Sequence, residues 1–544
     1  MKKTWFREGF VYQIYPRSFQ DSNGDGIGDL QGIISRIPYL VSLGVSMVWL
    51  SPVYLSPNDD NGYDISDYYD IQPDFGTLDD MKELISKFHA NGIKLIMDLV
   101  VNHTSDEHPW FIQSKKNIPP FNDYYHWSPK KKNWTSFFGG EAWTKDETRN
   151  EYYLHLFSKK QPDLNWDHPG VREGVKDIMR FWLNLGVDGF RCDVINLIAK
   201  EDGLPNGKPG IILVGKEHYM NHPKIHPYLQ ELRDDVLSKY DCFTVGETAF
   251  VSPETALKYI DEDIRELDMV FQFDHMAADI HYVKWFMKKF KPINLKKPLS
   301  KWQRGLYPNG WNSLYLENHD QPRSVSRFGS VEYHYESATM LATMLYFQQG
   351  TPYIYQGQEL GMTNIEFDDL DDYKDIESHN IYHFGRKLMM SHGRMMHKLK
   401  KMSRDNARTP MQWSHEENAG FTTNQPWIKI NRNYEKINVT DEETDPKSIL
   451  NYYKQIVALR KMYPVIVYGK YEDIQFHHKT LYAYSRTLEK EKLIVVCNLS
   501  DRDLKLKSSI NLSEYQCVLH NYDEVSNETL LKPYEARVYY RKSE

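Results

Sequence analysis

The sequence predicts an α/β fold, a (β/α)₈ TIM barrel with an inserted domain and a C-terminal antiparallel β-sandwich domain. Eight short apolar segments alternate with helical patterns over most of the chain, which is the order of elements in such a barrel. About sixty aromatic-rich residues follow the third segment, too many for a simple connecting loop. Towards the end, the pattern changes to alternation, which is typical of antiparallel strands. An open doubly wound sheet is the alternative, but no glycine-rich phosphate loop follows the first segment.

The elements can be placed from their apolar runs and stop signals. We expect strands at residues 10–15, 46–50, 94–101, 186–194, 244–247, 269–273, 313–316 and 352–355. Helical patterns lie at 30–43, stopped by Gly44, and at 332–347 and 448–462. Thr77, with an acidic residue three positions later, predicts the start of a further helix that stops near Gly92.

These elements suggest where the domains begin and end. We expect the barrel to comprise residues 1–103 and 169–465, interrupted by an inserted domain at 104–168. A second, charged insertion follows the eighth strand at about 363–433. The β-domain is expected at 466–544.

Composition excludes several classes of protein. The 544 residues carry a net charge of −8, whereas a nucleic-acid-binding protein would show basic patches. No apolar stretch is long enough to span a bilayer, and the N-terminus has no apolar signal-peptide core. The scattered cysteines form no disulfide framework; they are Cys192, Cys242, Cys497 and Cys517. We therefore expect a cytoplasmic protein, a monomer, with no nucleic-acid or membrane partner.

The stretch 186–194 is the centre of the predicted site. The helix before it has one apolar face, and Gly186 is the expected left-handed stop. Side chains alternate along a strand, so Arg191 and Asp193 point the same way. A guanidinium group beside a carboxylate favours the ionised form, which a nucleophile at a sugar carbon requires. A purely structural Arg–Asp pair is the alternative.

Four acidic residues are expected at or near the C-terminal ends of strands, on the face of a barrel that carries active sites. They are Asp98, Asp193, Glu247 and Asp320. Apolar neighbours favour a raised pKa for Glu247, which suits a general acid, whereas Asp193 should stay ionised. Two carboxyl groups in different roles are the minimum for glycoside hydrolysis. A catalytic transition metal is not expected, because no histidine pair stands at a ligand spacing with a third ligand.

Motifs in order along the chain carry a family resemblance. Residues 98–103 (DLVVNH), 189–193 (GFRCD), 245–247 (VGE) and 318–320 (NHD) resemble the four signature regions of the α-amylase family of glycoside hydrolases. Residues 161–165 (QPDLN) are similar to the fifth region of its oligo-1,6-glucosidase and α-glucosidase branch. The match spans essentially the whole chain. Cys192 departs from the Met or Leu that this branch often has.

The resemblance implies a barrel with an inserted domain B, and roles for individual residues. Asp193 is then the nucleophile, Glu247 the acid/base and Asp320 the transition-state stabiliser. The terminal glucose is bound by Asp60, Tyr63, His103, Arg191, His319 and Arg404. Gln161 of the fifth motif and Val194 are expected beside the substrate. In enzymes that this sequence resembles, Val after the nucleophile accompanies a preference for α-1,6 linkages, and Ala or Thr a preference for α-1,4.

A loop after the first strand has the pattern of a Ca²⁺ site. Residues 21–29 (DSNGDGIGD) place oxygen-bearing side chains at every second position, with glycines between. Gly32 stands where an EF-hand would have its bidentate Glu, so this is no EF-hand. The loop resembles a structural Ca²⁺ (or Mg²⁺) site of the same glucosidase branch, which implies five ligands: Asp21, Asn23, Asp25, Asp29 and the Ile27 carbonyl. A solvated turn is the alternative.

The leading functional hypothesis is a retaining, exo-acting α-glucosidase that hydrolyses terminal α-1,6-linked glucose from isomaltose and short isomalto-oligosaccharides. A trehalose-6-phosphate hydrolase or an α-1,4-preferring α-glucosidase would use the same frame. Sucrose isomerisation is disfavoured, because residues 323–327 (RSVSR) replace the Arg-Leu-Asp-Arg-Asp loop of those enzymes. A non-catalytic, amylase-like binding ectodomain would need no catalytic carboxylates, yet all three are present.

Overall fold

The computed structural model describes residues 3–210, 212–506, 512–525 and 529–543. Its central sheet consists of parallel strands in the order β11-β10-β9-β5-β2-β1-β13-β12. The strands are β1 (Val11–Ile14), β2 (Met47–Leu50), β5 (Lys94–Leu99), β9 (Gly189–Cys192), β10 (Phe243–Glu247), β11 (Met269–Phe271), β12 (Ser313–Leu314) and β13 (Thr351–Tyr355). A parallel bridge between Val270 and Asn312 joins the two end strands. The sheet therefore closes into the predicted barrel.

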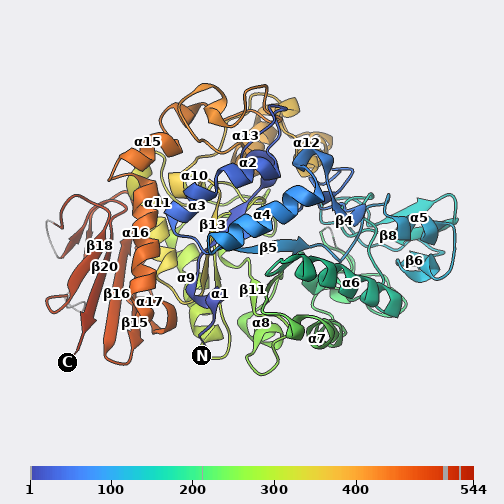
Figure 1. Cartoon of the computed structure of the whole chain (residues 1–544), viewed down its shortest axis with the longest axis horizontal. Coiled ribbons are helices and arrows are strands. Elements are labelled where there is room, and N and C mark those ends of the chain that lie inside the picture. The colour runs from blue at the N-terminus through green and yellow to red at the C-terminus, as the bar shows by residue number, and fades with distance from the viewer. Residues whose placement is uncertain (1–2, 211, 507–511, 526–528, 544) are drawn as a thin grey trace.

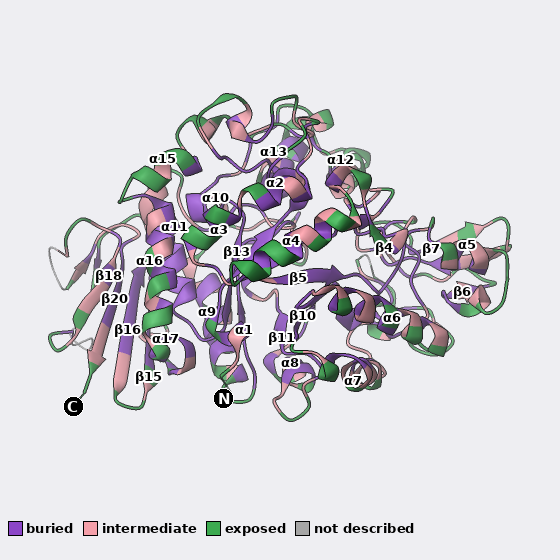
Figure 2. Cartoon of the chain, viewed as in Figure 1, coloured by how far each residue is buried: buried purple, intermediate pink, exposed green. Residues whose placement is uncertain are grey.

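Helices surround the barrel and turn their apolar faces inward. They include α4 (Leu78–Ala90), α6 (Pro169–Leu185), α7 (Ile225–Asp235), α8 (Pro253–Ile260), α9 (Pro292–Leu306) and α11 (His334–Tyr346). Figure 2 shows the buried strands inside and the exposed residues of α4 and α6 on their outer sides. Thr77 and Asp80 form the predicted capping box of α4, and Gly186 ends α6 in the left-handed conformation.

The helix predicted at 30–43 is two helices. α2 (Leu30–Ser35) ends at Arg36, and α3 (Ile37–Leu43) begins directly after it. Pro38 lies in the first turn of α3, where its missing N–H is tolerated, whereas one continuous helix would have lost a hydrogen bond there. The prediction was wrong because the apolar periodicity continues through the break.

The inserted segment and the C-terminal sheet lie at opposite ends of the molecule (Figure 1). The inserted segment contains α5 (Pro109–Lys115) and a small antiparallel sheet of β6 (Trp127–Ser128), β8 (Glu151–Leu154) and β7 (Trp143–Asp146). Its aromatic residues form much of its interior, with Trp134 and Trp143 both buried. The aromatic content that marked this segment in the sequence therefore divides between this cluster and the main core, which includes Trp166.

Helices also fill the insertion after the eighth strand. α12 (Ile376–Lys387), α13 (His392–Met402) and α14 (Asp405–Arg408) lie there, above the barrel in Figure 1. Two further helices, α15 (Val439–Thr444) and α16 (Ile449–Met462), lead to the C-terminal region.

The C-terminal strands are antiparallel, as predicted. One sheet has the order β14-β15-β16-β20-β18, with β14 (Lys470–Ile474), β15 (Leu481–Leu488), β16 (Glu491–Asn498), β18 (Gln516–His520) and β20 (Ala536–Lys542). A second pairs β17 (Leu504–Lys505) with β19 (Leu530–Leu531). The first strand begins at Lys470, after a short helix, α17 (Pro464–Tyr468), in which Pro464 takes the first position. Among the helices that the structure describes, none is long and apolar enough to cross a membrane.

Candidate active site

Arg191 holds together three carboxyl groups from neighbouring strands. Its Nη1 atom lies 2.6 Å from Oδ1 of Asp98 on β5 and 2.6 Å from Oδ1 of Asp193, directly after β9. Its Nη2 atom lies 2.6 Å from Oε2 of Glu247, at the end of β10. The predicted side-by-side placement of Arg191 and Asp193 is confirmed. The contact with Glu247 was not predicted, and it makes Arg191 the link between the expected nucleophile and the expected acid/base.

Burial raises the pKa values of both Asp193 and Glu247, and the two values differ only slightly. Burial raises the pKa of Glu247 to about 7, Arg191 opposes this, and the charge of Asp193 adds to it. Burial also raises the pKa of Asp193 to about 6, against the effect of Arg191. Glu247 therefore binds a proton at higher pH, as predicted for a general acid. Asp193 is mostly ionised at pH 7, but its pKa lies above the ordinary value because burial outweighs the guanidinium group.

Asp320 is the third carboxylate of the predicted set, and it has its own cations. Its Oδ1 atom lies 2.9 Å from Nη2 of Arg408 and 3.3 Å from Nη1 of Arg404. Burial opposes ionisation, but the neighbouring His319, Arg404 and Arg408 outweigh it and hold the pKa of Asp320 well below its ordinary range. Asp320 is therefore an anion at neutral pH, and its side chain is 31% exposed.

The residues expected to bind glucose form a connected wall. Nη2 of Arg404 lies 3.0 Å from Oδ1 of Asp60, and Nε2 of Gln161 donates to Oδ2 of Asp60 at 3.2 Å. The Tyr63 hydroxyl lies 2.8 Å from Nε2 of His319, and the two rings stack with their centroids 5.3 Å apart. Residues from the barrel, the inserted segment and the late insertion thus meet at one place.

Both histidines of this wall are neutral at pH 7. Burial lowers the pKa of His319 to about 3 and also lowers the pKa of His103. Nε2 of His103 lies 3.1 Å from the Tyr63 carbonyl oxygen and 3.2 Å from the amide nitrogen of Gln161. The arrangement brings together two carboxyl groups of different proton affinity, a third that stays ionised and two neutral histidines, a set that could break a bond to a sugar carbon.

The chain can be compared with known proteins on this basis. Residues 13–469 match the family described as alpha amylase, catalytic domain.

The chain belongs to the α-amylase family.

Its similarity to individual members extends over the full length. An oligo-1,6-glucosidase from Parageobacillus thermoglucosidasius is 53% identical over 560 residues, which cover 99% of both proteins. The structure of a trehalose-6-phosphate hydrolase from Bacillus licheniformis superposes with a TM-score of 0.93 at 43% identity, covering 99% of this chain and 100% of that one. An isomaltulose synthase from Klebsiella sp. LX3 has a TM-score of 0.95 at 41% identity, with the same coverage. These relatives confirm the fold class and the glycoside hydrolase family.

Sequence reasoning missed several buried charges of this α-amylase family site. Asp375 lies on the late insertion, and its Oδ1 atom is 2.5 Å from Nη2 of Arg404. Arg408 stands four residues after Arg404, a spacing that could have marked it as a second cation facing the same cleft. Lys200, beyond β9, lies 2.7 Å from Asp163 of the inserted segment, and both side chains are fully buried. No local pattern reveals such partners, because they come from distant parts of the chain.

Val194 has an unusual backbone for a β-branched residue. Its φ is +35°, in the left-handed region that such side chains rarely adopt. Its side chain is half-buried against the apolar cluster of the inserted segment, which includes Trp134 and Tyr219. This conformation turns the chain away from the barrel immediately after Asp193.

The loop at residues 21–29 winds around two carboxylates. Asp21 accepts hydrogen bonds from the backbone N–H groups of Asn23, Gly24 and Gly26. Asp29 caps α2 by accepting from the Gly32 N–H. Within the described residues, no group of three or more Asp, Glu, His or Cys side chains is placed to hold a metal ion. A cation here would need neutral oxygen ligands as well. The Asn23 side chain and the Ile27 carbonyl offer oxygen ligands of the kind that Ca²⁺ binds.

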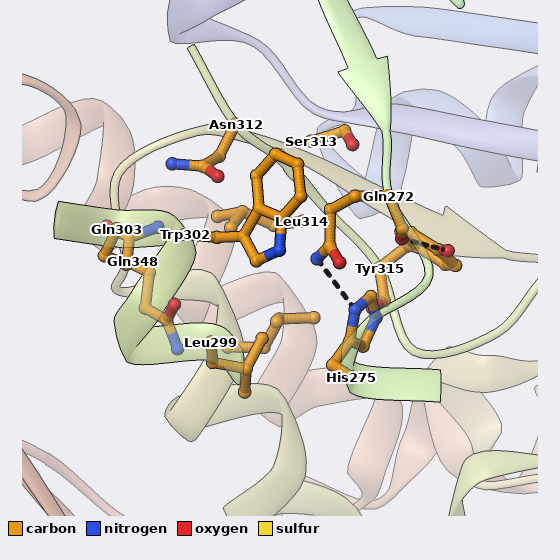
Figure 3. A pocket seen from close by; sticks show the side chains of 11 residues that line it. Gln272, His275, Leu299, Trp302, Gln303, Asn312, Ser313, Leu314, Tyr315 and Gln348 are labelled. Carbon is orange, nitrogen blue, oxygen red and sulfur yellow. Dashed lines mark hydrogen bonds between the residues drawn. The ribbon is translucent and has the colours of Figure 1, made fainter. Parts of the chain in front are cut away.

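A small interior cavity lies apart from this cleft. It measures about 10 Å³ and is lined by Gln272, His275, Trp302 and Tyr315 (Figure 3), and by none of the three predicted catalytic carboxylates. Its volume suits about one water molecule, not a sugar.

Proposed function

We propose that this protein is a retaining, exo-acting α-glucosidase that releases terminal α-1,6-linked glucose from isomaltose and short isomalto-oligosaccharides. The observation that carries the proposal is the pairing of Asp193 with Glu247. One guanidinium group contacts both, with Nη1 of Arg191 2.6 Å from Oδ1 of Asp193 and Nη2 2.6 Å from Oε2 of Glu247. Two carboxyl groups bridged by one side chain suit the retaining mechanism, since inverting enzymes keep theirs about 6.5–9.5 Å apart to admit a water.

In the first step, a carboxylate oxygen of Asp193 attacks the anomeric carbon of the terminal glucose. The bond from that carbon to the glycosidic oxygen breaks, and Glu247 gives its proton to the departing oxygen. Asp193 then carries a glucosyl ester, and the remaining sugar leaves with a free hydroxyl group.

In the second step, Glu247 is a carboxylate and removes a proton from a water molecule. The water oxygen attacks the same carbon, the ester bond breaks, and Asp193 is restored. Two displacements return the α configuration. The anion of Asp320 and the negative ends of nearby dipoles favour the positive charge that develops on the sugar ring between these states.

Exo action is supported by the burial of the residues expected to bind the terminal glucose. Asp60, His103 and Arg404 are at most 6% exposed and are joined by direct or Gln161-mediated hydrogen bonds. A polysaccharide chain could not continue through this wall, so the bound glucose must be a chain end. Donors and acceptors in fixed positions also favour one particular pattern of hydroxyl groups.

The substrate is supported by the relatives' names together with Val194, which stands directly after the nucleophile. Trehalose-6-phosphate hydrolysis is the second candidate, favoured by the likeness to the Bacillus licheniformis enzyme. That reaction needs cations free to bind phosphate, whereas Arg191, Arg404 and Arg408 are each paired with carboxylates. A hydrolysis panel of isomaltose, isomaltotriose, maltose, sucrose and trehalose-6-phosphate tests the proposal. The highest kcat/KM is expected on an isomalto-sugar, and a highest value on trehalose-6-phosphate would replace it with the second candidate.

The proposal includes a structural cation. Asp21, Asn23, Asp25, Asp29 and the Ile27 carbonyl would hold one Ca²⁺ (or Mg²⁺) in the loop after β1. Hydrogen bonds from Asn424 to Gly24 and from Thr422 to Asp21 tie this loop to the late insertion. Its role would be to fix the loop, since none of the three predicted catalytic carboxylates belongs to it.

A further inference from the structure

Gln13 lies on β1, directly behind the ring of His319. Its side chain is buried, with the whole residue 1% exposed. The amide nitrogen lies 2.8 Å from Nδ1 of His319 and 3.2 Å from Oγ of Ser51. Gln13 touches none of the three predicted catalytic carboxylates, and nothing in the proposed mechanism uses it. Its contact with His319 nevertheless reaches the wall that holds the glucose.

The other side of His319 faces an anion. Nε2 lies 2.8 Å from the Tyr63 hydroxyl and 3.5 Å from Oδ2 of Asp320. Arg404 and Arg408 keep Asp320 ionised. A lone pair on Nε2 would face this negative charge, whereas an N–H would be attracted to it. A neutral histidine carries one ring proton, so Nδ1 must then accept a hydrogen bond.

Another buried histidine of the chain shows the same arrangement without ambiguity. Nε2 of His275 lies 2.8 Å from the Tyr315 carbonyl oxygen, which can only accept, so Nε2 carries the proton. The amide nitrogen of Gln272 then donates to Nδ1 at 2.9 Å (Figure 3). In His275, an amide nitrogen behind Nδ1 therefore accompanies a protonated Nε2.

We propose that Gln13 is a positioning residue that donates a hydrogen bond to Nδ1 of His319 and holds its Nε2–H toward the glucose-binding cleft. Ser51 accepts the second amide hydrogen of Gln13, which fixes the orientation of the amide group. The donation from His319 to a sugar hydroxyl rests on the proposed function. The tautomer of His319 does not depend on that function. The donor is set before substrate arrives, so no rearrangement is needed when the sugar binds.

Nitrogen NMR of the full-length protein, labelled with ¹⁵N in its histidine rings, tests the tautomer directly. The His319 signals are assigned by their loss in His319→Gln and, independently, by their shift in Tyr63→Phe. In the unmodified protein at neutral pH, we expect a protonated Nε2 and an unprotonated Nδ1. A protonated Nδ1 in the unmodified neutral ring would overturn the proposal.

Kinetics test whether the tautomer matters for the reaction. Gln13→Met keeps the length of the side chain but removes its hydrogen bonds, and kcat/KM for isomaltose is expected to fall about tenfold or more. Gln348→Met is the matched control, because Gln348 is equally buried but bonds to Met344 and Tyr482, away from the cleft. The melting temperature should fall by a similar amount in both variants, and only Gln13→Met should lose activity. Full activity in Gln13→Met would show that the contact is only structural. Should the unmodified protein not cleave isomaltose, the proposed function fails while the NMR result still decides the tautomer.

Discussion

The backbone N–H of Val194 donates a hydrogen bond to Oε2 of Glu247 at 3.2 Å. Val194 directly follows Asp193, so the segment that carries the expected nucleophile also holds the expected acid/base. Arg191 donates to the same oxygen of Glu247. Since Oε2 accepts two N–H groups, the proton of the acid belongs on Oε1, where it can reach a leaving group.

The first prediction is a narrow pH optimum. Asp193 must be deprotonated to attack, and its pKa is raised to about 6; Glu247 must be protonated, and its pKa is raised to about 7. kcat/KM for isomaltose should therefore rise as pH increases through about 6 and fall above about 7. Glu247→Gln should keep some activity on an aryl glucoside, because that leaving group needs no proton. The kcat/KM of this variant should no longer fall at alkaline pH. A rate that stays level well into the alkaline range would contradict these roles.

The second prediction concerns Arg191 and the stability of the barrel. Arg191→Met leaves Asp98, Asp193 and Glu247 without their shared cation in a buried site. Its free energy of unfolding should fall by about 3–5 kcal/mol, as for other broken buried pairs. The matched control is Arg180→Met, because Arg180 also pairs with two carboxylates but is partly exposed on α6; it should cost at most about 1 kcal/mol. If denaturant titrations show equal losses in the free energy of unfolding of the two variants, Arg191 makes no special contribution to stability.

Much of the fold could be predicted because its signals are local. Gly44 and Gly186 end their helices in the left-handed conformation, and the alternation of Arg191 and Asp193 placed both side chains on one face. The break at Pro38 was missed because apolar spacing continues across it.

The site itself was only partly predictable. The four acids could be found from their places at strand ends, but their proton affinities depend on burial, which exceeds the effect of Arg191 at Asp193. Arg408 and Asp375 come from the late insertion and meet Asp320 and Arg404 only in the folded chain. The four-residue spacing of Arg404 and Arg408 indicates a shared direction, but nothing in the sequence records their contacts with Asp320 and Asp375.

The third prediction is that a cation stabilises the loop at residues 21–29. Because a ligand that binds only the folded protein stabilises it, a chelator should lower the melting temperature and added Ca²⁺ should restore it. Asp25→Asn should remove this response, whereas Asp70→Asn, an exposed control outside the loop, should keep it. If the melting temperature is insensitive to chelator and to Ca²⁺, and elemental analysis finds no metal, the loop is an ordinary turn that binds no cation.

The fourth prediction is linkage preference. Val194 directly follows the expected nucleophile, and we expect part of its stiff branched side chain to lie near the scissile bond, where an α-1,6 linkage adds a rotatable CH₂ that can pass around it. A methyl-sized change in such a pocket is worth roughly 1–3 kcal/mol, so isomaltose should exceed maltose by about tenfold or more in kcat/KM. The ratio should narrow in Val194→Ala. Thr has nearly the same volume as Val, so Val194→Thr separates bulk from polarity. Equal or better cleavage of maltose by the unmodified protein would contradict the predicted linkage preference but not the proposed α-glucosidase activity.

The fifth prediction addresses the central claim, that Asp193 and Glu247 act as nucleophile and acid/base of a double displacement. Proton NMR during the first minutes of isomaltose hydrolysis reports the anomer released before mutarotation. Retention predicts α-glucose as the first product, and Asp193→Asn, with an unchanged melting profile, should lose nearly all turnover. β-Glucose as the first product would contradict the account.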